Sequence, residues 1–422
     1  MIDLFLLYSK SFEDNFFELS FDHRFRIHPL KILDNSSLLD IKVIANKEET
    51  NFFVICEGND FLTHYHDNAK LTAIVDEASR FGADIVFGGA ESFEYGLYVS
   101  ENLFWVDSCS RPSFAIILRK LFPYIISDTN GFKNIRSLED LDKISSNKFL
   151  IYPFISIKKF KSDEINRPSL LCSITMERLA AIKKLKQYYS VPSLINLSDY
   201  DIESVKIPTY VINLPSRPER LSHIMNQFRD KSEFDLHITQ AYKHERGATG
   251  LWQSICSIVK TAVLNDDDVI IIVEDDHVFT EHYDRNILIT NIILAGSQGA
   301  DILCGGISGG FHYAIPITQH RYWINYFWGT QFIIIYKKMF ELILNAEFGI
   351  TDTADDFLSS LTVNKMVLFP FISVQRDFGY SDITLNNEER GDLSKIFTST
   401  EKKLAIYGSA YRKYIINSSL SS

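Results

Sequence analysis

Three consecutive carboxylates, Glu274, Asp275 and Asp276, follow a run of β-branched residues in the segment VIIIVEDDHVF. Such a run predicts a buried strand, so the three side chains should lie where that strand ends. Adjacent carboxylates repel one another, and a fold that gathers them commonly supplies a cation. Oxygen ligands suit Mg²⁺ or Mn²⁺. A solvated acidic loop is the alternative, but the buried strand and the motifs around it favour a metal site.

A second segment, NLPSRPERL, begins at Asn213 and carries two arginines, Arg217 and Arg220, in a proline-bounded turn. Guanidinium groups match phosphate oxygens in a bidentate way, so this turn suits a nucleotide diphosphate. A third segment, GATGLWQS, opens a predicted helix, and the free amides around Gly250 could meet an anion or a sugar hydroxyl. Solvated arginines and an ordinary helix start are the alternative interpretations.

A fourth segment, TDTADDFL, places Asp355 and Asp356 at the start of an apolar helix. Asp352 or Thr353 could cap that helix. The functional interpretation is that Asp355 or Asp356 acts as a general base. A fifth segment, QRDFGYSDI, either closes over a substrate or is an ordinary loop.

Strands predicted at 209–214, 269–273, 301–304 and 332–336 alternate with helices predicted at 251–264 and 284–295. This alternation predicts an α/β fold with a mainly parallel sheet flanked by helices. Ligands of such sheets collect beyond the carboxyl ends of the strands. The acidic and basic segments above should therefore meet at one edge of the sheet.

The chain contains an internal repeat. Residues 57–89 align without a gap on residues 274–306, with 11 of 33 positions identical. We therefore expect two tandem Rossmann-like domains. The first copy reads Glu57-Gly58-Asn59 in place of the acidic triplet, with Asp60 one position late, and has no paired arginines. The expected organisation is a degenerate, non-catalytic domain at 1–165, a helical linker at 166–205, a catalytic domain at 206–395 and a helical tail at 396–422.

Composition narrows the class of protein. The 422 residues carry a net charge of −11, which argues against a protein that coats nucleic acid. The five cysteines are scattered, and no apolar run is long enough to span a bilayer. We expect a cytoplasmic protein, with peripheral contact at the inner membrane surface and a homodimer left open.

Taken together, the segments resemble glycosyltransferase family 25, the lipopolysaccharide and collagen galactosyltransferase group. VINLPSRPERL, GATGLWQS, VIIIVEDDHVF, WGTQFIIIYKKMFELIL, TDTADDFL and QRDFGYSDIT carry the resemblance over residues 206–390. It implies a GT-A fold and metal-dependent, inverting transfer of a hexose, typically galactose, from a UDP-sugar to a glycan or glycoconjugate acceptor. Trp252 and Ile255 depart from the family's pattern, which leaves the acceptor open.

Site roles carried over from the resemblance follow the family's motifs. Asp276 would be the direct Mn²⁺ or Mg²⁺ ligand, with Glu274 and Asp275 completing the metal and nucleotide motif. Asn213, Arg217 and Arg220 would hold the nucleotide, and Asp355 or Asp356 would be the base. Two alternatives stay open: an inactive glycan- or nucleotide-binding scaffold, and a nucleotidyltransferase, although neither copy shows a glycine-rich phosphate loop.

Overall fold

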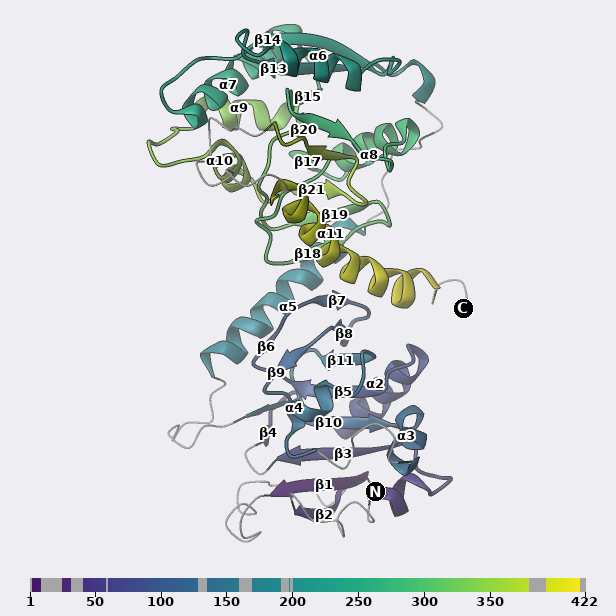
Figure 1. The fold of residues 1–422 in the computed structure, drawn as a ribbon. Helices are drawn as coiled ribbons and strands as arrows, with labels where there is room; N and C mark the ends of the chain where they lie inside the picture. Colours follow the sequence, from purple (N-terminus) through teal and green to yellow (C-terminus); the bar gives the residue numbers. More distant parts are fainter. Residues whose placement is uncertain are drawn as a thin grey trace. The chain divides into compact units, whose positions relative to one another are not determined.

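The computed structural model describes residues 2–8, 25–31, 41–57, 60–127, 135–158, 169–190, 197, 200–378 and 392–417. The chain divides into two compact units. Unit 1 comprises Met1–Leu185 and Ser409–Ser422, and unit 2 comprises Lys186–Gly408. The first division falls inside the segment expected to be a linker (Figure 1).

Unit 2 is built on an eight-stranded sheet in which six strands run in one direction and two, β20 (Phe332–Tyr336) and β19 (Arg321–Ile324), run in the opposite direction. The strands of this sheet are strongly apolar, and Ile270 to Val273 of β15 (Val269–Glu274) are at most 1% exposed. The order across the sheet is β14 (Phe234–Gln240), β13 (Ile207–Asn213), β15 (Val269–Glu274), β20 (Phe332–Tyr336), β17 (Ile302–Cys304), β21 (Lys365–Leu368), β19 (Arg321–Ile324) and β18 (Ala314–Pro316).

Unit 1 repeats this sheet strand for strand, with the same parallel and antiparallel neighbours (Figure 1). Its order is β2 (Phe25–Lys31), β1 (Ile2–Tyr8), β3 (Phe52–Glu57), β10 (Ser113–Leu118), β5 (Ile85–Gly89), β11 (Lys148–Ile151), β8 (Leu103–Val106) and β7 (Gly96–Tyr98). The predicted α/β fold with two Rossmann-like sheets is thus confirmed. The strand predicted at 332–336 is β20, but the sequence pattern does not indicate that β20 and its counterpart β10 run antiparallel to their neighbours.

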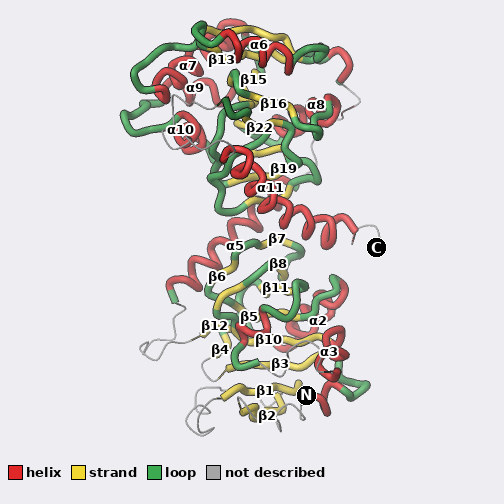
Figure 2. The backbone as a smooth tube through the Cα atoms, in the orientation of Figure 1, coloured by secondary structure: helices red, strands yellow, loops and turns green. Residues whose placement is uncertain are grey.

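Short two-stranded sheets lie beside the main ones (Figure 2). In unit 2, β16 (His277–Phe279) pairs with β22 (Ser373–Gln375). In unit 1, β4 (Asp60–Leu62) pairs with β12 (Ser156–Lys158), and β6 (Ser92–Phe93) pairs with β9 (Cys109–Ser110).

Helices flank both sheets. Among the described residues, none of them is long and apolar enough to cross a bilayer. Unit 2 contains α6 (Pro218–Gln227), α7 (Gly247–Asn265), α8 (Arg285–Ser297), α9 (Lys337–Asn345), α10 (Ala354–Leu361) and most of α11 (Asp392–Tyr411). Unit 1 contains α2 (Asn68–Arg80), α3 (Phe122–Ser127), α4 (Leu138–Asp142) and most of α5 (Leu170–Tyr189).

Two helices pass from one unit's residues to the other's. The last turn of α5 belongs to unit 2, where the Lys186 ammonium donates to the Pro316 carbonyl at 2.8 Å. The end of α11 and the helical turn Arg412–Ile416 belong to unit 1. There the Tyr414 ring lies 5.2 Å from that of Phe149, and its hydroxyl lies 3.1 Å from Asn147 Oδ1. Unit 1 is therefore made from two separate stretches of sequence.

Candidate functional site

The acidic triplet lies where β15 ends, as the sequence predicts, with Asp275 and Asp276 in the turn before β16. Asp275 is 6% exposed and has two side-chain partners. Asn213, the last residue of β13, donates its amide to Asp275 Oδ2 at 2.8 Å, and Arg220 Nη1 donates to Oδ1 at 3.1 Å. Asp275 therefore holds β13, α6 and β15 together at this edge.

Arg220 belongs to α6 and is 5% exposed. Its guanidinium also lies 3.9 Å from Asp276 Oδ2 and stacks 4.7 Å above the Phe378 ring. Arg217 is the N-terminal cap residue of the same helix, and the Asn213 amide lies 3.5 Å from its backbone carbonyl. The two predicted phosphate-binding arginines thus differ: Arg220 is paired with carboxylates, whereas Arg217 is half-buried at the helix start.

Asp276 and Glu274 are partly buried carboxyls with raised pKa values. The Asp276 side chain is 16% exposed, and its Oδ1 is buried without a hydrogen-bond partner among the described residues. Burial, followed by the neighbouring Asp275 charge, raises the pKa of Asp276 to about 7. Burial and then the Asp276 charge raise the pKa of Glu274 to about 8. This edge therefore favours an added proton or cation.

The second acidic segment forms the first turn of α10. The Thr353 hydroxyl lies 2.7 Å from Asp355 Oδ1 and 2.8 Å from Asp356 Oδ2. The charge of Asp355 contributes to the raised pKa of Glu274, which places α10 within electrostatic reach of the end of β15. Glu274 thus lies within electrostatic reach of both Asp276 and Asp355 at one edge of the sheet.

The loop before β20 supplies contacts that sequence reasoning missed. The Thr330 hydroxyl donates to Glu274 Oε1 at 2.6 Å, and the Gly329 amide donates to Asp355 Oδ2 at 3.0 Å. The indole N–H of Trp328, a residue that is 48% exposed, donates to Asp356 Oδ1 at 2.8 Å. Because β20 is antiparallel to β15, its beginning lies beside the end of β15. The available signal was the WGTQ segment directly before an apolar run.

Gly250 lies in the first turn of α7, close to the loop that follows β14. A Cβ added there would overlap the Tyr242 carbonyl oxygen. Ser254 reinforces this packing, because its hydroxyl donates to the Gly250 carbonyl at 2.8 Å and accepts from the Tyr242 amide at 2.9 Å. Close backbone packing therefore accounts for a glycine at this position. Of the segment QRDFGYSDI, only Gln375–Phe378 falls within the described residues.

The residues at this edge fit a cation that brings other ligands with it. Within the described part of the chain, no three His, Cys, Asp or Glu side chains are grouped to hold a metal ion by themselves. The unpartnered Oδ1 of Asp276, next to Glu274, offers carboxylate oxygens. Mg²⁺ is commonly bound by one or two carboxylates together with substrate phosphates and water, and this donor set matches that pattern.

Comparisons with known proteins leave the family open. No family model matches the chain, and no curated protein matches it. Among solved structures, A197 from STIV is 17% identical with a TM-score of 0.31, covering 41% of this chain and 86% of its own. An apo UDP-glucose pyrophosphorylase is 12% identical with a TM-score of 0.22, covering 44% and 82%. Neither similarity bears on activity, so membership of glycosyltransferase family 25 stays a prediction.

Proposed function

We propose that unit 2 is a metal-dependent glycosyltransferase that moves a hexose, galactose in the first instance, from a UDP-sugar to a hydroxyl of a glycan or glycoconjugate. One observation carries the proposal. A buried, unpartnered carboxylate oxygen of Asp276 lies directly after the end of β15, beside Glu274, whose pKa is raised by burial and by the charges of Asp276 and Asp355. The ordered series of motifs that resembles family 25 supports the same activity.

In this proposal Asp276 and Glu274 hold Mn²⁺ or Mg²⁺. When bound, the cation offsets the negative charge that develops on the departing diphosphate. Arg220 places a guanidinium beside Asp276, and Asn213 and Arg220 fix the neighbouring Asp275. These contacts keep the carboxylates in place before the donor arrives, so little reorganisation accompanies the reaction.

The base in this proposal is Asp355 or Asp356. It takes the proton from the acceptor hydroxyl while that oxygen bonds to the anomeric carbon and the bond from that carbon to the diphosphate oxygen breaks. Displacement from the opposite side inverts the anomeric centre. The Gly329 amide and the Trp328 indole hold the two carboxylates by hydrogen bonds to their oxygens.

The first test compares the melting temperature of wild type with that of Asp276→Asn, against a panel of nucleotide sugars with and without Mn²⁺. A ligand at about 100 times its Kd stabilises the native state by about 2.7 kcal/mol, or about 5–10 °C for a unit of this size. We expect a Mn²⁺-dependent rise of this order with one UDP-sugar in wild type and none in the variant.

Asp268→Asn is the matched control. It removes one carboxylate from the other end of β15, where the side chain is 91% exposed, and should keep the full rise. Turnover of Asp276→Asn should fall by at least about 100-fold. No shift with any nucleotide sugar would contradict the transferase, whereas normal turnover of Asp276→Asn would contradict only the metal role.

A further inference from the structure

Unit 1 keeps the framework of the acidic edge, so the two units can be compared position by position. Glu57 ends β3 as Glu274 ends β15. Asp60 of β4 lies opposite Lys158 of β12, just as His277 of β16 lies opposite Gln375 of β22. Lys158 therefore occupies the place in unit 1 that Gln375 occupies in unit 2.

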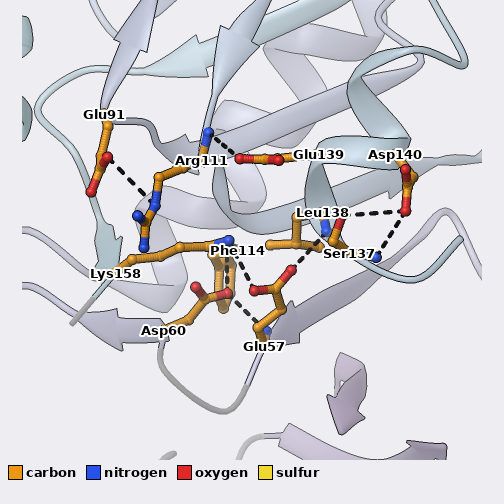
Figure 3. Close-up of polar contacts among 10 residues, drawn as sticks. All are labelled: Glu57, Asp60, Glu91, Arg111, Phe114, Ser137, Leu138, Glu139, Asp140 and Lys158. Carbon is orange, nitrogen blue, oxygen red and sulfur yellow. Dashed lines mark hydrogen bonds and ion pairs between the residues drawn. The ribbon is translucent and has the colours of Figure 1, made fainter. Parts of the chain in front are cut away.

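Lys158 points at the retained glutamate (Figure 3). Its ammonium lies 2.9 Å from Glu57 Oε2, and the lysine side chain is only 6% exposed. The other oxygen of Glu57 accepts the Leu138 amide at 2.8 Å. Both oxygens of Glu57 are thus engaged by donors from unit 1, one of them a full positive charge.

Asp60 is a second carboxyl within reach of this charge. It is 1% exposed, and its Oδ2 accepts the backbone amides of Glu57 and Phe114 at 2.9 and 3.1 Å. Its Oδ1 is buried without a hydrogen-bond partner among the described residues. Burial raises the pKa of Asp60 to about 7, although the Lys158 charge acts in the opposite direction. Unit 1 therefore has two carboxyls around one ammonium.

The corresponding edge of unit 2 carries a different set of charged groups. Gln375 is uncharged, and it lowers the pKa of Asp276 without placing a positive charge there. The Gly329 amide that binds Asp355 in unit 2 has its counterpart in the Arg111 amide, which donates to Glu139 Oε1 at 3.1 Å, so unit 1 keeps this carboxylate. Asp275 and Asp276, however, correspond at the offset of 217 residues to Gly58 and Asn59, which carry no charge. From unit 2 to unit 1, the edge therefore loses two carboxylates of the triplet and gains Asp60 and Lys158. The net loss of one carboxylate and the added ammonium both lower its need for a cation.

We propose that Lys158 is a tethered cation: its ammonium stands in unit 1 where the corresponding edge of unit 2 would take a divalent ion. Unit 1 then binds no divalent cation, and its site is complete without one. Replacing Lys158 by the glutamine of unit 2 should open a divalent-cation site whose ligands are Glu57 and Asp60. Removal of one partner of a buried pair leaves an uncompensated charge, which an added cation can neutralise.

The test is a Mn²⁺ titration of the full chain, followed by electron paramagnetic resonance of the free ion. We expect Lys158→Gln to bind about one Mn²⁺ more per chain than wild type does, and its melting temperature to rise with Mn²⁺ by more than that of wild type. The matched control is Lys143→Gln, which removes a lysine that is 78% exposed and lies 3.8 Å from Asp140. It should bind as wild type does.

The number of Mn²⁺ ions bound by Lys158→Gln is compared with the number bound by wild type. The result therefore does not depend on whether unit 2 binds metal or transfers sugar. An unchanged Mn²⁺ count in a folded Lys158→Gln would overturn the proposal.

A second set of variants covers a loss of folding in Lys158→Gln. Glu57→Gln/Lys158→Gln removes both charges, so in EDTA its melting temperature should lie closer to wild type than the sum of the two single losses predicts. It should also bind no additional Mn²⁺. Additive losses would show that the two charges do not balance each other, and the proposal would fail.

Discussion

At the scale of single residues, the carboxylates at the two equivalent strand ends are balanced by different groups. Asp275 is held by Asn213 and Arg220, whereas Glu57 is held by Lys158 and a backbone amide. At this edge of each unit, one carboxylate oxygen, of Asp60 or of Asp276, nevertheless stays buried and unpartnered among the described residues. Each such oxygen costs free energy unless a proton or cation meets it, so both positions should respond to pH, and Asp276 should respond to metal as well.

The pH response of unit 1 follows from Asp60. The folded carboxyl keeps its proton up to about pH 7, whereas its unperturbed pKa is 3.8. The folded state therefore binds more protons in this interval, and the free energy of unfolding falls as pH rises from about 4 to about 7. We expect Asp60→Asn to reduce this fall, measured by urea unfolding at pH 4, 5.5 and 7.

Asp140→Asn serves as the control of opposite sign. Burial alone would raise the pKa of Asp140. The hydrogen bonds from the Arg136 and Ser137 amides lower it by more, so the net shift is downward. Asp140 therefore stabilises the fold at neutral pH, and that contribution is lost as pH falls. A profile for Asp60→Asn that parallels wild type would contradict the assignment of Asp60.

Some residues of the candidate site could be predicted from sequence and others could not. The triplet and Asp355 were predicted because each lies next to a strand end or a helix start that local pattern reveals. Thr330 and Trp328 were missed as site residues because their place depends on β20 running antiparallel, which an apolar run does not show. The pairing of Arg220 with Asp275 was missed because ion pairs between distant segments leave no local signal.

At the scale of elements, a pair of glycines lets the small sheet approach the main sheet in each unit. Gly305 and Gly306 follow β17 closely and face the start of β22, and a Cβ on Gly306 would overlap the Ser373 carbonyl oxygen. A Cβ on Gly89 of unit 1 would likewise overlap the Ser156 carbonyl oxygen. The small sheet carries Gln375 or Lys158 to the acidic edge, so these glycines position the residues that distinguish the units.

We expect Gly306→Ala and Gly89→Ala to cost about 3 kcal/mol or more each in urea unfolding, since a backbone oxygen cannot move aside as a side chain can. Gly305→Ala is the comparison. Its Cβ would lie 2.7 Å from Phe332 Cδ1, which is a side-chain atom and not backbone, so the loss should be smaller. A larger loss for Gly305→Ala than for Gly306→Ala would contradict this account of the close approach.

At the scale of the whole molecule, the two sheets have the same strand order, but unit 1 is discontinuous in sequence. The duplication was predictable because an offset of 217 residues is preserved over a long segment. That residues 409–417 belong to unit 1 could not be predicted, because a short amphipathic helical segment does not reveal which apolar surface it covers. Tyr414, 2% exposed, packs there against Phe149 and near Trp105.

Tyr414 should therefore stabilise unit 1 although it lies beyond the last residue of unit 2. We expect Tyr414→Ala to destabilise unit 1 by about 3–5 kcal/mol, as removal of a buried aromatic side chain commonly does. Tyr414→Phe, which removes only the hydroxyl near Asn147, should cost about 0.5–1.5 kcal/mol. Hydrogen exchange should place the loss of protection in β8 and β11. Loss confined to unit 2 would contradict the division.

The discontinuity of unit 1 has a consequence for biosynthesis. Residues up to 185 leave the ribosome first, yet Tyr414 follows only after all of unit 2 has been translated. At 5–20 residues per second, this interval is roughly 10–45 s. During it, the surface of Phe149 that Tyr414 later covers is open to solvent and to other nascent chains. The unit that is translated first is therefore the one completed last, and its exposed surface is where a chaperone would have most to protect.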